Sequence, residues 1–326
     1  MLPLPAFKLH QPRTLPEAVS MLHRFGPDAR VIAGGTDLVP NLKHGLLAPR
    51  ALVSLQHVEA LRGIAQSEAA LVIGAMTSLD EIASDPRVLE AAPALAHAAD
   101  AVGGPHHRRM GTLGGNLCLD TRCRYYNQTY FWRAALGFCL KKDGTVCHVV
   151  AGGQKCVAAA SNDTAPALIA LEATIELESV RGRRLVEAKS FYTADGIRNT
   201  ILEADEIVAR VSVPLVSGRR SAFDKVRRRN AIDFPLLSVA ARADYEASAM
   251  TSVDVVVSAL AARPRRLAAA QKLHPGVSAA EASAALVQAS KRECKPLENI
   301  EGDAEWRHDM VPVVVERVLS RVLRFG

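Results

Sequence analysis

Five of the six cysteines in this chain of 326 residues fall within one stretch, residues 118–156. Four, fifteen, seven and eight residues separate them in turn: Cys118, Cys123, Cys139, Cys147 and Cys156. Thiolates can bind zinc or an iron–sulfur cluster, but no pair here has the C-x2-C spacing typical of zinc ribbons and bacterial ferredoxins. The spacing alone therefore leaves an iron–sulfur cluster, a structural zinc ion and unligated thiols equally open.

Three features of this stretch favour ligation. Cysteine is otherwise scarce, the stretch has no helical or strand periodicity, and a long irregular loop needs a cross-link that a metal site can supply. Cys118 adjoins a glycine turn, where we expect a small buried thiol that only packs, and His148 is expected to be structural. The predicted ligands are Cys123, Cys139, Cys147 and Cys156.

Two glycine-rich turns, about eighty residues apart, are the other candidates for chemistry. The first, Gly-Gly-Thr-Asp at 34–37, follows a predicted strand at 30–33 and precedes a predicted helix. Such a turn lets backbone N–H groups approach a phosphate, although a plain tight turn is the commoner role of paired glycines. The second turn covers residues 112–116. Together they suit a ligand with two phosphates, and Asp37 and Asp163 could accept hydrogen bonds from its hydroxyl groups.

The remaining elements predict three parts, of which the first two are α/β units. Residues 1–60 form a small unit, residues 61–218 a second one that contains the cysteines at about 118–160, and residues 219–326 a third one with an antiparallel sheet. We expect helices at 88–102 and 305–323, the latter with an apolar stripe that belongs to the core. Basic residues alternate along a predicted strand at 223–229, where an anion contact and a plain exposed face are equally open: Lys225, Arg227 and Arg229.

Composition is that of a soluble globular protein, with 49% hydrophobic residues and a net charge of +6. The first residues lack the apolar segment of a signal peptide, so we expect a cytoplasmic protein whose thiols stay reduced. No nucleic-acid motif accompanies the basic charge. A solvated surface explains the charge most simply, and a docking face for an acidic electron-transfer protein would look the same.

These motifs together resemble the FAD-binding subunits of molybdenum hydroxylases, of the xanthine dehydrogenase and carbon monoxide dehydrogenase type. The resemblance implies an α+β fold: a PCMH-type FAD-binding domain of two α/β subdomains, then a small C-terminal domain of antiparallel sheet plus helices. It also implies FAD contacts through both turns and several single positions: Val31, Ile32, Ala33, Gly34, Gly35, Thr36, Asp37, Leu38, Val102, Thr112, Gly114, Gly115, Asn116, Asp163, Ile207 and Lys225.

The long connection between the second turn and Asp163 resembles more narrowly the flavin subunits of 4-hydroxybenzoyl-CoA reductases. That resemblance implies a 4Fe-4S cluster on Cys123, Cys139, Cys147 and Cys156. It further implies a molybdopterin-containing large subunit, a small subunit with two 2Fe-2S clusters, and ferredoxin as donor in a heterohexamer. Electrons would pass from 4Fe-4S to FAD, to 2Fe-2S and to molybdenum, and no acid or base is needed of this chain. The alternatives are a hydroxylase subunit that passes electrons to NAD and a zinc-stabilised, non-redox binding protein.

Overall fold

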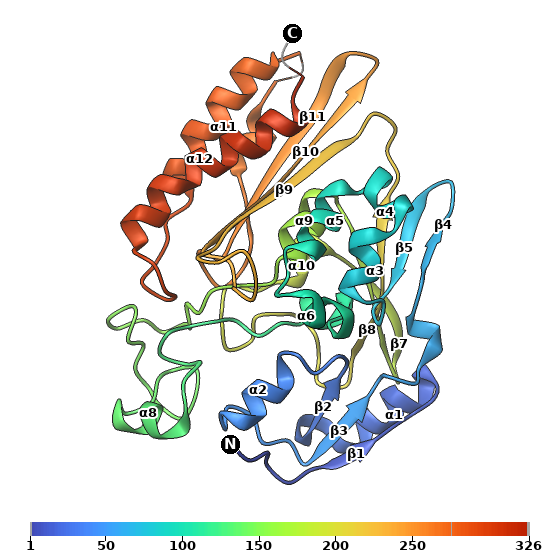
Figure 1. Ribbon diagram of the computed structural model, residues 1–326, viewed down its shortest axis with the longest axis vertical. Helices are drawn as coiled ribbons and strands as arrows, with labels where there is room; N and C mark the ends of the chain where they lie inside the picture. Colours follow the sequence, from blue (N-terminus) through green and yellow to red (C-terminus); the bar gives the residue numbers. More distant parts are fainter. Residues whose placement is uncertain (1, 275, 325–326) are drawn as a thin grey trace.

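Three sheets follow one another along the chain and along the long axis of the molecule (Figure 1). The structure, a computed structural model, describes residues 2–274 and 276–324. The first sheet is parallel, in the order β1-β3-β2. Its elements are β1 (Lys8–His10), α1 (Leu15–Phe25), β2 (Ala29–Ile32), α2 (Leu38–Lys43) and β3 (Ala51–Ser54). Thr14 and Glu17 form a capping box that fixes the start of α1, and the buried face of this helix covers the sheet.

The second sheet has five antiparallel strands in the order β4-β5-β8-β6-β7. Its strands are β4 (Ile64–Gln66), β5 (Ala70–Gly74), β6 (Thr174–Ser179), β7 (Gly182–Glu187) and β8 (Ile207–Pro214). Short helices lie between them in the chain: α3 (Leu79–Ser84), α4 (Pro86–Ala91), α5 (Pro93–Asp100), α6 (Pro105–Met110), α7 (Leu113–Leu117), α8 (Tyr130–Ala135), α9 (Thr164–Ala170) and α10 (Ala188–Phe191).

The third sheet is antiparallel, in the order β12-β11-β10-β9, and is covered on both faces. Its elements are β9 (Arg220–Val226), β10 (Leu237–Glu246), β11 (Ala249–Ser258), β12 (Arg265–Arg266), α11 (Ala279–Glu293) and α12 (Ala304–Val322). Ala240 and Val256 pack into the core of the second part, whereas their neighbours Val239 and Val255 pack against the C-terminal helices. This alternation joins the third sheet to α5 and α9 through apolar burial.

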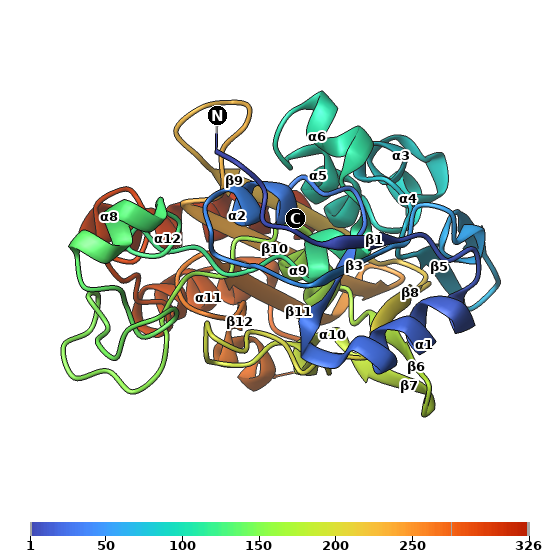
Figure 2. The same cartoon turned by 90° about the horizontal axis from the view of Figure 1, so that it is seen from below.

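Residues 118–160, which we call the cysteine excursion, leave the body between α7 and α9 and stand at one side of it in both views (Figures 1 and 2). Its base is held by backbone pairing between Arg122 and Ala159. Asn299, in the loop before α12, accepts from the N–H of Arg124 at 2.8 Å and donates to the carbonyl of Val157 at 2.6 Å. The segment has few regular elements and is held in place by such single contacts. Its sequence therefore shows neither helical nor strand periodicity.

The predicted α+β class is confirmed, and so is the apolar stripe of the last helix, which is buried. The single helix expected at 88–102 is wrong, because Pro93 cannot continue a helix and starts α5 instead. The alternating strand at 223–229 is also wrong, since β9 ends at Val226 and places Arg227 and Arg229 beyond it. Within the described residues, no helix is both long and apolar enough to cross a bilayer.

Candidate functional site

The loop between β2 and α2 presents unused backbone donors. None of the N–H groups of residues 34–37 donates a hydrogen bond to any described residue. Gly35 has a φ of +72°, a left-handed conformation that turns the chain and that glycine adopts without strain. The loop is half-exposed, with Thr36 facing solvent. Consecutive free N–H groups on an accessible turn form a cradle for an anion such as a phosphate.

Gly34 brings this loop against a distant part of the chain. A Cβ added to Gly34 would lie 1.7 Å from the carbonyl oxygen of Met110, and one added to Gly111 would lie 3.6 Å from Oγ1 of Thr36. The first glycine loop therefore packs directly on the residues that precede the second. The two motifs, far apart in sequence, border one region of the molecule.

The second glycine motif differs from the first, because it forms the start of helix α7 and its donors are already used. All four backbone N–H groups from residue 113 to residue 116 donate within the protein. Their acceptors are the carbonyls of Thr77, Ala75 and Thr112 and the hydroxyl of Thr112. A Cβ added to Gly114 would lie only 2.9 Å from Cβ of Ala75. This motif is thus built for close packing, and the loop at 34–37 is the better phosphate cradle.

Asp163 and Lys225 form a buried ion pair between the second and third parts. Nζ of Lys225 lies 2.7 Å from Oδ2 of Asp163, and the two side chains are 2% and 4% exposed. Lys225 and Arg227 also donate to the carbonyl of Ala101, beside Val102. Burial raises the pKa of Asp163 to about 6, against the opposing effect of Lys225. Oδ1 of Asp163 is buried without a partner, which suits a hydroxyl or N–H donor from a ligand.

Two other predicted residues are engaged elsewhere. Asp37 forms an ion pair with Arg122, and its Oδ2 accepts from Asn41 at 3.1 Å, so this carboxylate is not free for a ligand hydroxyl. Arg122 also covers the ring of Phe234 at 4.3 Å. Sequence reasoning missed Arg122, whose only signal was its place beside Cys123. Ile207 has an apolar side chain that is buried in the core of the first part, so this side chain is not available to a ligand.

The structure brings the four predicted ligand cysteines around one cavity. Cys123, Cys139, Cys147 and Cys156 line it together with Tyr125, Tyr126, Lys141 and His148, among others. Burial raises the pKa of Cys123 to about 11. The thiol of Cys156 also has a raised pKa through burial, and nearby Lys141 acts against this rise. A backbone N–H group points at one of the sulfurs, since Ala158 donates to Cys156 at 3.5 Å.

This cavity has no preformed site for a single ion. Among residues 2–274 and 276–324, no group of three or more Cys, His, Asp or Glu side chains could hold one metal ion. The space between the thiols is about 20 Å³, room for about one water molecule. His148 bonds the carbonyl of Phe138 at 2.6 Å, in agreement with its expected structural role. The 4Fe-4S cluster stays a prediction. The four cysteines match the ligands of such a cluster in residue type and number.

The expectation that Cys118 is a buried, packing thiol is wrong. Cys118 is exposed to solvent and does not line the four-cysteine cavity. The protein around it still desolvates the thiol enough to raise its pKa to about 12. Its omission from the ligand set agrees with its position.

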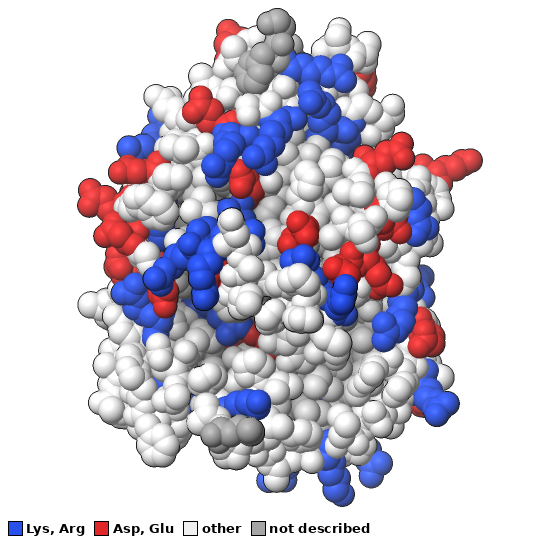
Figure 3. Space-filling view, in the orientation of Figure 1, with Lys and Arg blue, Asp and Glu red and all other residues white. Residues whose placement is uncertain are grey.

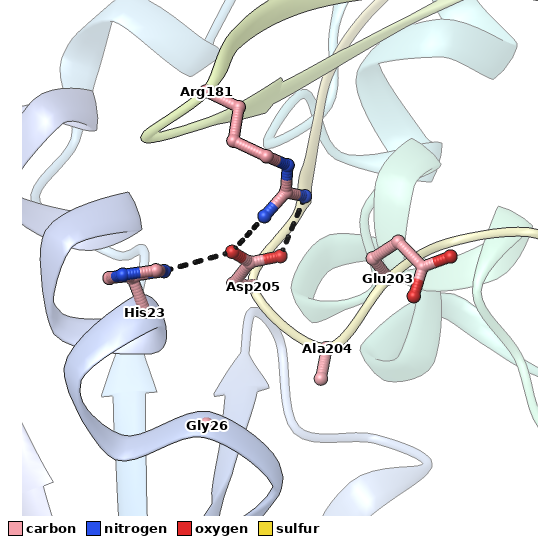
Figure 4. A pocket seen from close by; sticks show the side chains of 6 residues that line it. All are labelled: His23, Gly26, Arg181, Glu203, Ala204 and Asp205. Carbon is pink, nitrogen blue, oxygen red and sulfur yellow. Dashed lines mark hydrogen bonds and ion pairs between the residues drawn. The ribbon is translucent and has the colours of Figure 1, made fainter.

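A larger cavity, of about 490 Å³, lies apart from both sites (Figure 4). It is lined by residues that include His23, Arg181 and Asp205. Figure 4 shows the carboxylate of Asp205 paired with Arg181 and bonded to His23. Nδ1 of His23 lies 3.1 Å from Oδ2 of Asp205. Arg181 lowers the pKa of Asp205 to about 2. These groups satisfy one another and connect α1 to the turns around residues 181 and 205, so the cavity is not a candidate cofactor site.

Comparison with known proteins identifies the family. Residues 5–216 match the FAD binding domain in molybdopterin dehydrogenase, and residues 221–322 match the CO dehydrogenase flavoprotein C-terminal domain. The chain is 29% identical to the carbon monoxide dehydrogenase medium chain of Hydrogenophaga pseudoflava, covering 97% of this chain and 96% of that one. It is 31% identical to the nicotinate dehydrogenase FAD-subunit of Eubacterium barkeri, over 69% of this chain and 64% of the relative.

Solved structures agree with this assignment. Carbon monoxide dehydrogenase from H. pseudoflava, in a form lacking the Mo-pyranopterin moiety, superposes with a TM-score of 0.80 at 28% identity and 98% coverage of both chains. Quinoline 2-oxidoreductase from Pseudomonas putida 86 gives a TM-score of 0.76 at 26% identity, again with 98% coverage of both. The chain therefore belongs to the family of FAD-binding subunits of molybdenum hydroxylases.

Proposed function

We propose that this chain is the electron-transfer flavin subunit of a molybdenum enzyme that reductively dehydroxylates 4-hydroxybenzoyl-CoA to benzoyl-CoA. In that role it takes electrons from reduced ferredoxin through a 4Fe-4S cluster and passes them by way of FAD to its partner subunits. The single observation that carries the proposal is the gathering of four cysteines around one cavity in the excursion. The relatives' names support the wider setting, since they include medium chains and FAD-subunits of dehydrogenases.

The FAD site in this proposal lies where the two glycine motifs meet. The free N–H groups of residues 34–37 hold the pyrophosphate, and the packing of Gly34 on Met110 fixes the loop in place. Asp163 offers its unpartnered Oδ1 to a hydroxyl or ring N–H group of FAD, with Lys225 keeping the carboxylate in position. Bound flavin accepts one or two electrons, which allows it to connect one-electron carriers.

The cluster in this proposal is held by Cys123, Cys139, Cys147 and Cys156. Their number and type match the four thiolates that hold a 4Fe-4S cluster, and the N–H group of Ala158, directed at Cys156, matches the hydrogen bonds that tune such clusters. Because burial raises the pKa of Cys123 and Cys156, we expect these thiols to lose their protons only as iron binds. The small cavity requires the thiols to turn outward when the cluster forms.

A surface beside this cavity suits the electron donor. Helix α8 exposes an aromatic face, with Phe131 82% and Tyr130 54% exposed, and in Figure 3 its region at the lower left is largely free of charged side chains. Trp132 on the same helix lies 6.5 Å, centroid to centroid, from Tyr125, which lines the cavity. The excursion carries six basic and two acidic residues, but Arg133 and Lys141 are buried, so its surface is only slightly positive. The exposed aromatic face is therefore the feature that we propose for contact with a ferredoxin.

The molybdopterin-containing large subunit and the small subunit with two 2Fe-2S clusters complete the proposed heterohexamer. The substrate binds to neither the flavin loop nor the cysteine excursion in this assignment, so no acid or base on this chain takes part in dehydroxylation. A related hydroxylase subunit that delivers electrons to NAD has the same fold. The two functions differ in the need for the cysteine excursion.

Analysis of metal and flavin in the anaerobically purified complex tests this function. We expect about four iron atoms on this chain in addition to one FAD, since four thiolates and one flavin site are proposed. Cys139→Ser removes one ligand and should abolish the 4Fe-4S signal in low-temperature EPR while FAD is retained. Ferredoxin-dependent reduction of 4-hydroxybenzoyl-CoA should be lost with it.

Cys118→Ser is the matched control, because this cysteine belongs to the same segment but lies outside the cavity. It should keep both the cluster and FAD. Loss of the cluster in Cys118→Ser would overturn the ligand assignment, and zinc without flavin in the unmodified protein would overturn the electron-transfer function as a whole.

A further inference from the structure

One cation of the cysteine excursion is buried next to the thiols. The Lys141 side chain is 5% exposed. Its Nζ donates to Oδ1 of Asp120 at 2.6 Å, to Oγ1 of Thr121 at 2.6 Å and to the carbonyl of Thr121 at 3.1 Å. The ammonium also lies 4.3 Å from the centre of the Tyr126 ring. These contacts on several sides fix the charge in one place.

The position of this charge relative to the thiols is specific. Lys141 lines the four-cysteine cavity, whereas its counter-ion Asp120 does not and is 28% exposed. Oγ1 of Thr121, which accepts from Nζ at 2.6 Å, and Sγ of Cys156 lie 3.1 Å and 2.8 Å from one point, a Cβ added at Gly196, so the ammonium lies close to that thiol. Asp120 is the more exposed member of the pair. The adjacent Lys142 differs, because it is 39% exposed, pairs with Asp143 and does not line the cavity.

A fixed cation near a redox group acts unequally on its two oxidation states. Reduction adds one negative charge to a cluster and neither makes nor breaks a bond, so a nearby cation stabilises the reduced state more than the oxidised one. The effect is large where water is excluded, because the effective dielectric constant is low. Charge and hydrogen bonding around the sulfurs are established determinants of cluster potential.

We propose that Lys141 is a positioning residue that raises the reduction potential of the group held by the four cysteines, with Asp120 opposing it. The proposal rests on the proposed function, since it needs a cluster in the cavity. Its consequence is that the excursion sets the driving force for electron entry by a built-in ion pair. In this arrangement the two members of the pair shift the potential in opposite directions.

A redox titration of the anaerobic complex, followed by EPR of the 4Fe-4S cluster, tests this. Lys141→Met should shift the one-electron equilibrium at least tenfold toward the oxidised cluster. This corresponds to a decrease in the reduction potential of about 59 mV. Asp120→Asn should shift it in the opposite direction, because the counter-charge is removed and the ammonium remains. Lys142→Met, the exposed neighbour, should leave the potential unchanged.

The outcomes separate this inference from the function on which it rests. An iron-free unmodified protein overturns the proposed function and the inference together. Two outcomes overturn the inference alone. In one, Lys141→Met holds a full cluster whose reduction potential is unaltered. In the other, Lys141→Met and Asp120→Asn shift the reduction potential in the same direction. If Lys141→Met fails to assemble a cluster, Asp120→Asn decides: an increased potential supports the proposal, and an unchanged or decreased one rejects it.

Discussion

Gly34→Ala is expected to destabilise the protein strongly and to abolish FAD binding. The added methyl group would lie 1.7 Å from a backbone carbonyl oxygen, that of Met110, and 3.1 Å from the N–H nitrogen of Gly111. Neither atom can rotate away as a side chain could, so one segment of backbone must move. Overpacking costs about 1–3 kcal/mol where side chains can adjust, and we expect more than that here. The movement also separates the cradle at 34–37 from the segment that supports it.

Gly104→Ala provides the matched control for this substitution. Gly104 has extended backbone, and a Cβ added there would meet only ordinary contacts, the nearest at 3.4 Å on Ile232. Thermal unfolding and the ratio of FAD to protein should be near normal in Gly104→Ala and strongly reduced in Gly34→Ala. A Gly34→Ala protein with a full complement of FAD and the melting temperature of the control would show that the two segments do not pack as described.

The first glycine loop was predictable because its geometry is local. A strand, two glycines and a helix start determine where the N–H groups of residues 34–37 point. The second motif has a similar composition, yet its donors are used by Ala75 and Thr77, which are contacts between segments that no local pattern reports. The same applies to Arg122, whose partner Asp37 is 85 positions earlier in the chain.

The cysteines illustrate the same division between local and tertiary information. Scarcity and irregular spacing were enough to mark the segment as a candidate ligand site, and the four predicted thiols do line one cavity. Cys118 was set apart from them on an expectation of burial that is wrong. The environment of each thiol was not predictable. Cys118 follows a buried helix turn and was expected to be buried, but the body of the protein leaves it open to solvent. No local pattern marks Lys141, and only the fold shows that it is buried.

Removing one member of the Asp163–Lys225 pair is expected to have the second large effect. Both side chains are almost fully buried, so Lys225→Met leaves a carboxylate, and Asp163→Asn leaves an ammonium, without its partner. Each loss should cost about 3–5 kcal/mol at neutral pH, measured as the free energy of unfolding. The double substitution removes both charges and should recover most of this stability, since a buried pair can often be replaced by neutral groups.

FAD binding distinguishes a cofactor contact from a purely structural pair. If Asp163 and Lys225 hold FAD as proposed, the double variant should regain stability and still bind FAD much more weakly, because the ligand loses its charged acceptor at Oδ1. Arg219→Met is the control: this side chain is 4% exposed and pairs with Asp244 at 2.7 Å in the third sheet, away from both glycine motifs. It should lose stability and keep its affinity for FAD. Equal affinity for FAD in the double variant and the unmodified protein would show that the pair only joins the two parts of the fold. The assignment of Asp163 to the FAD site would then be wrong.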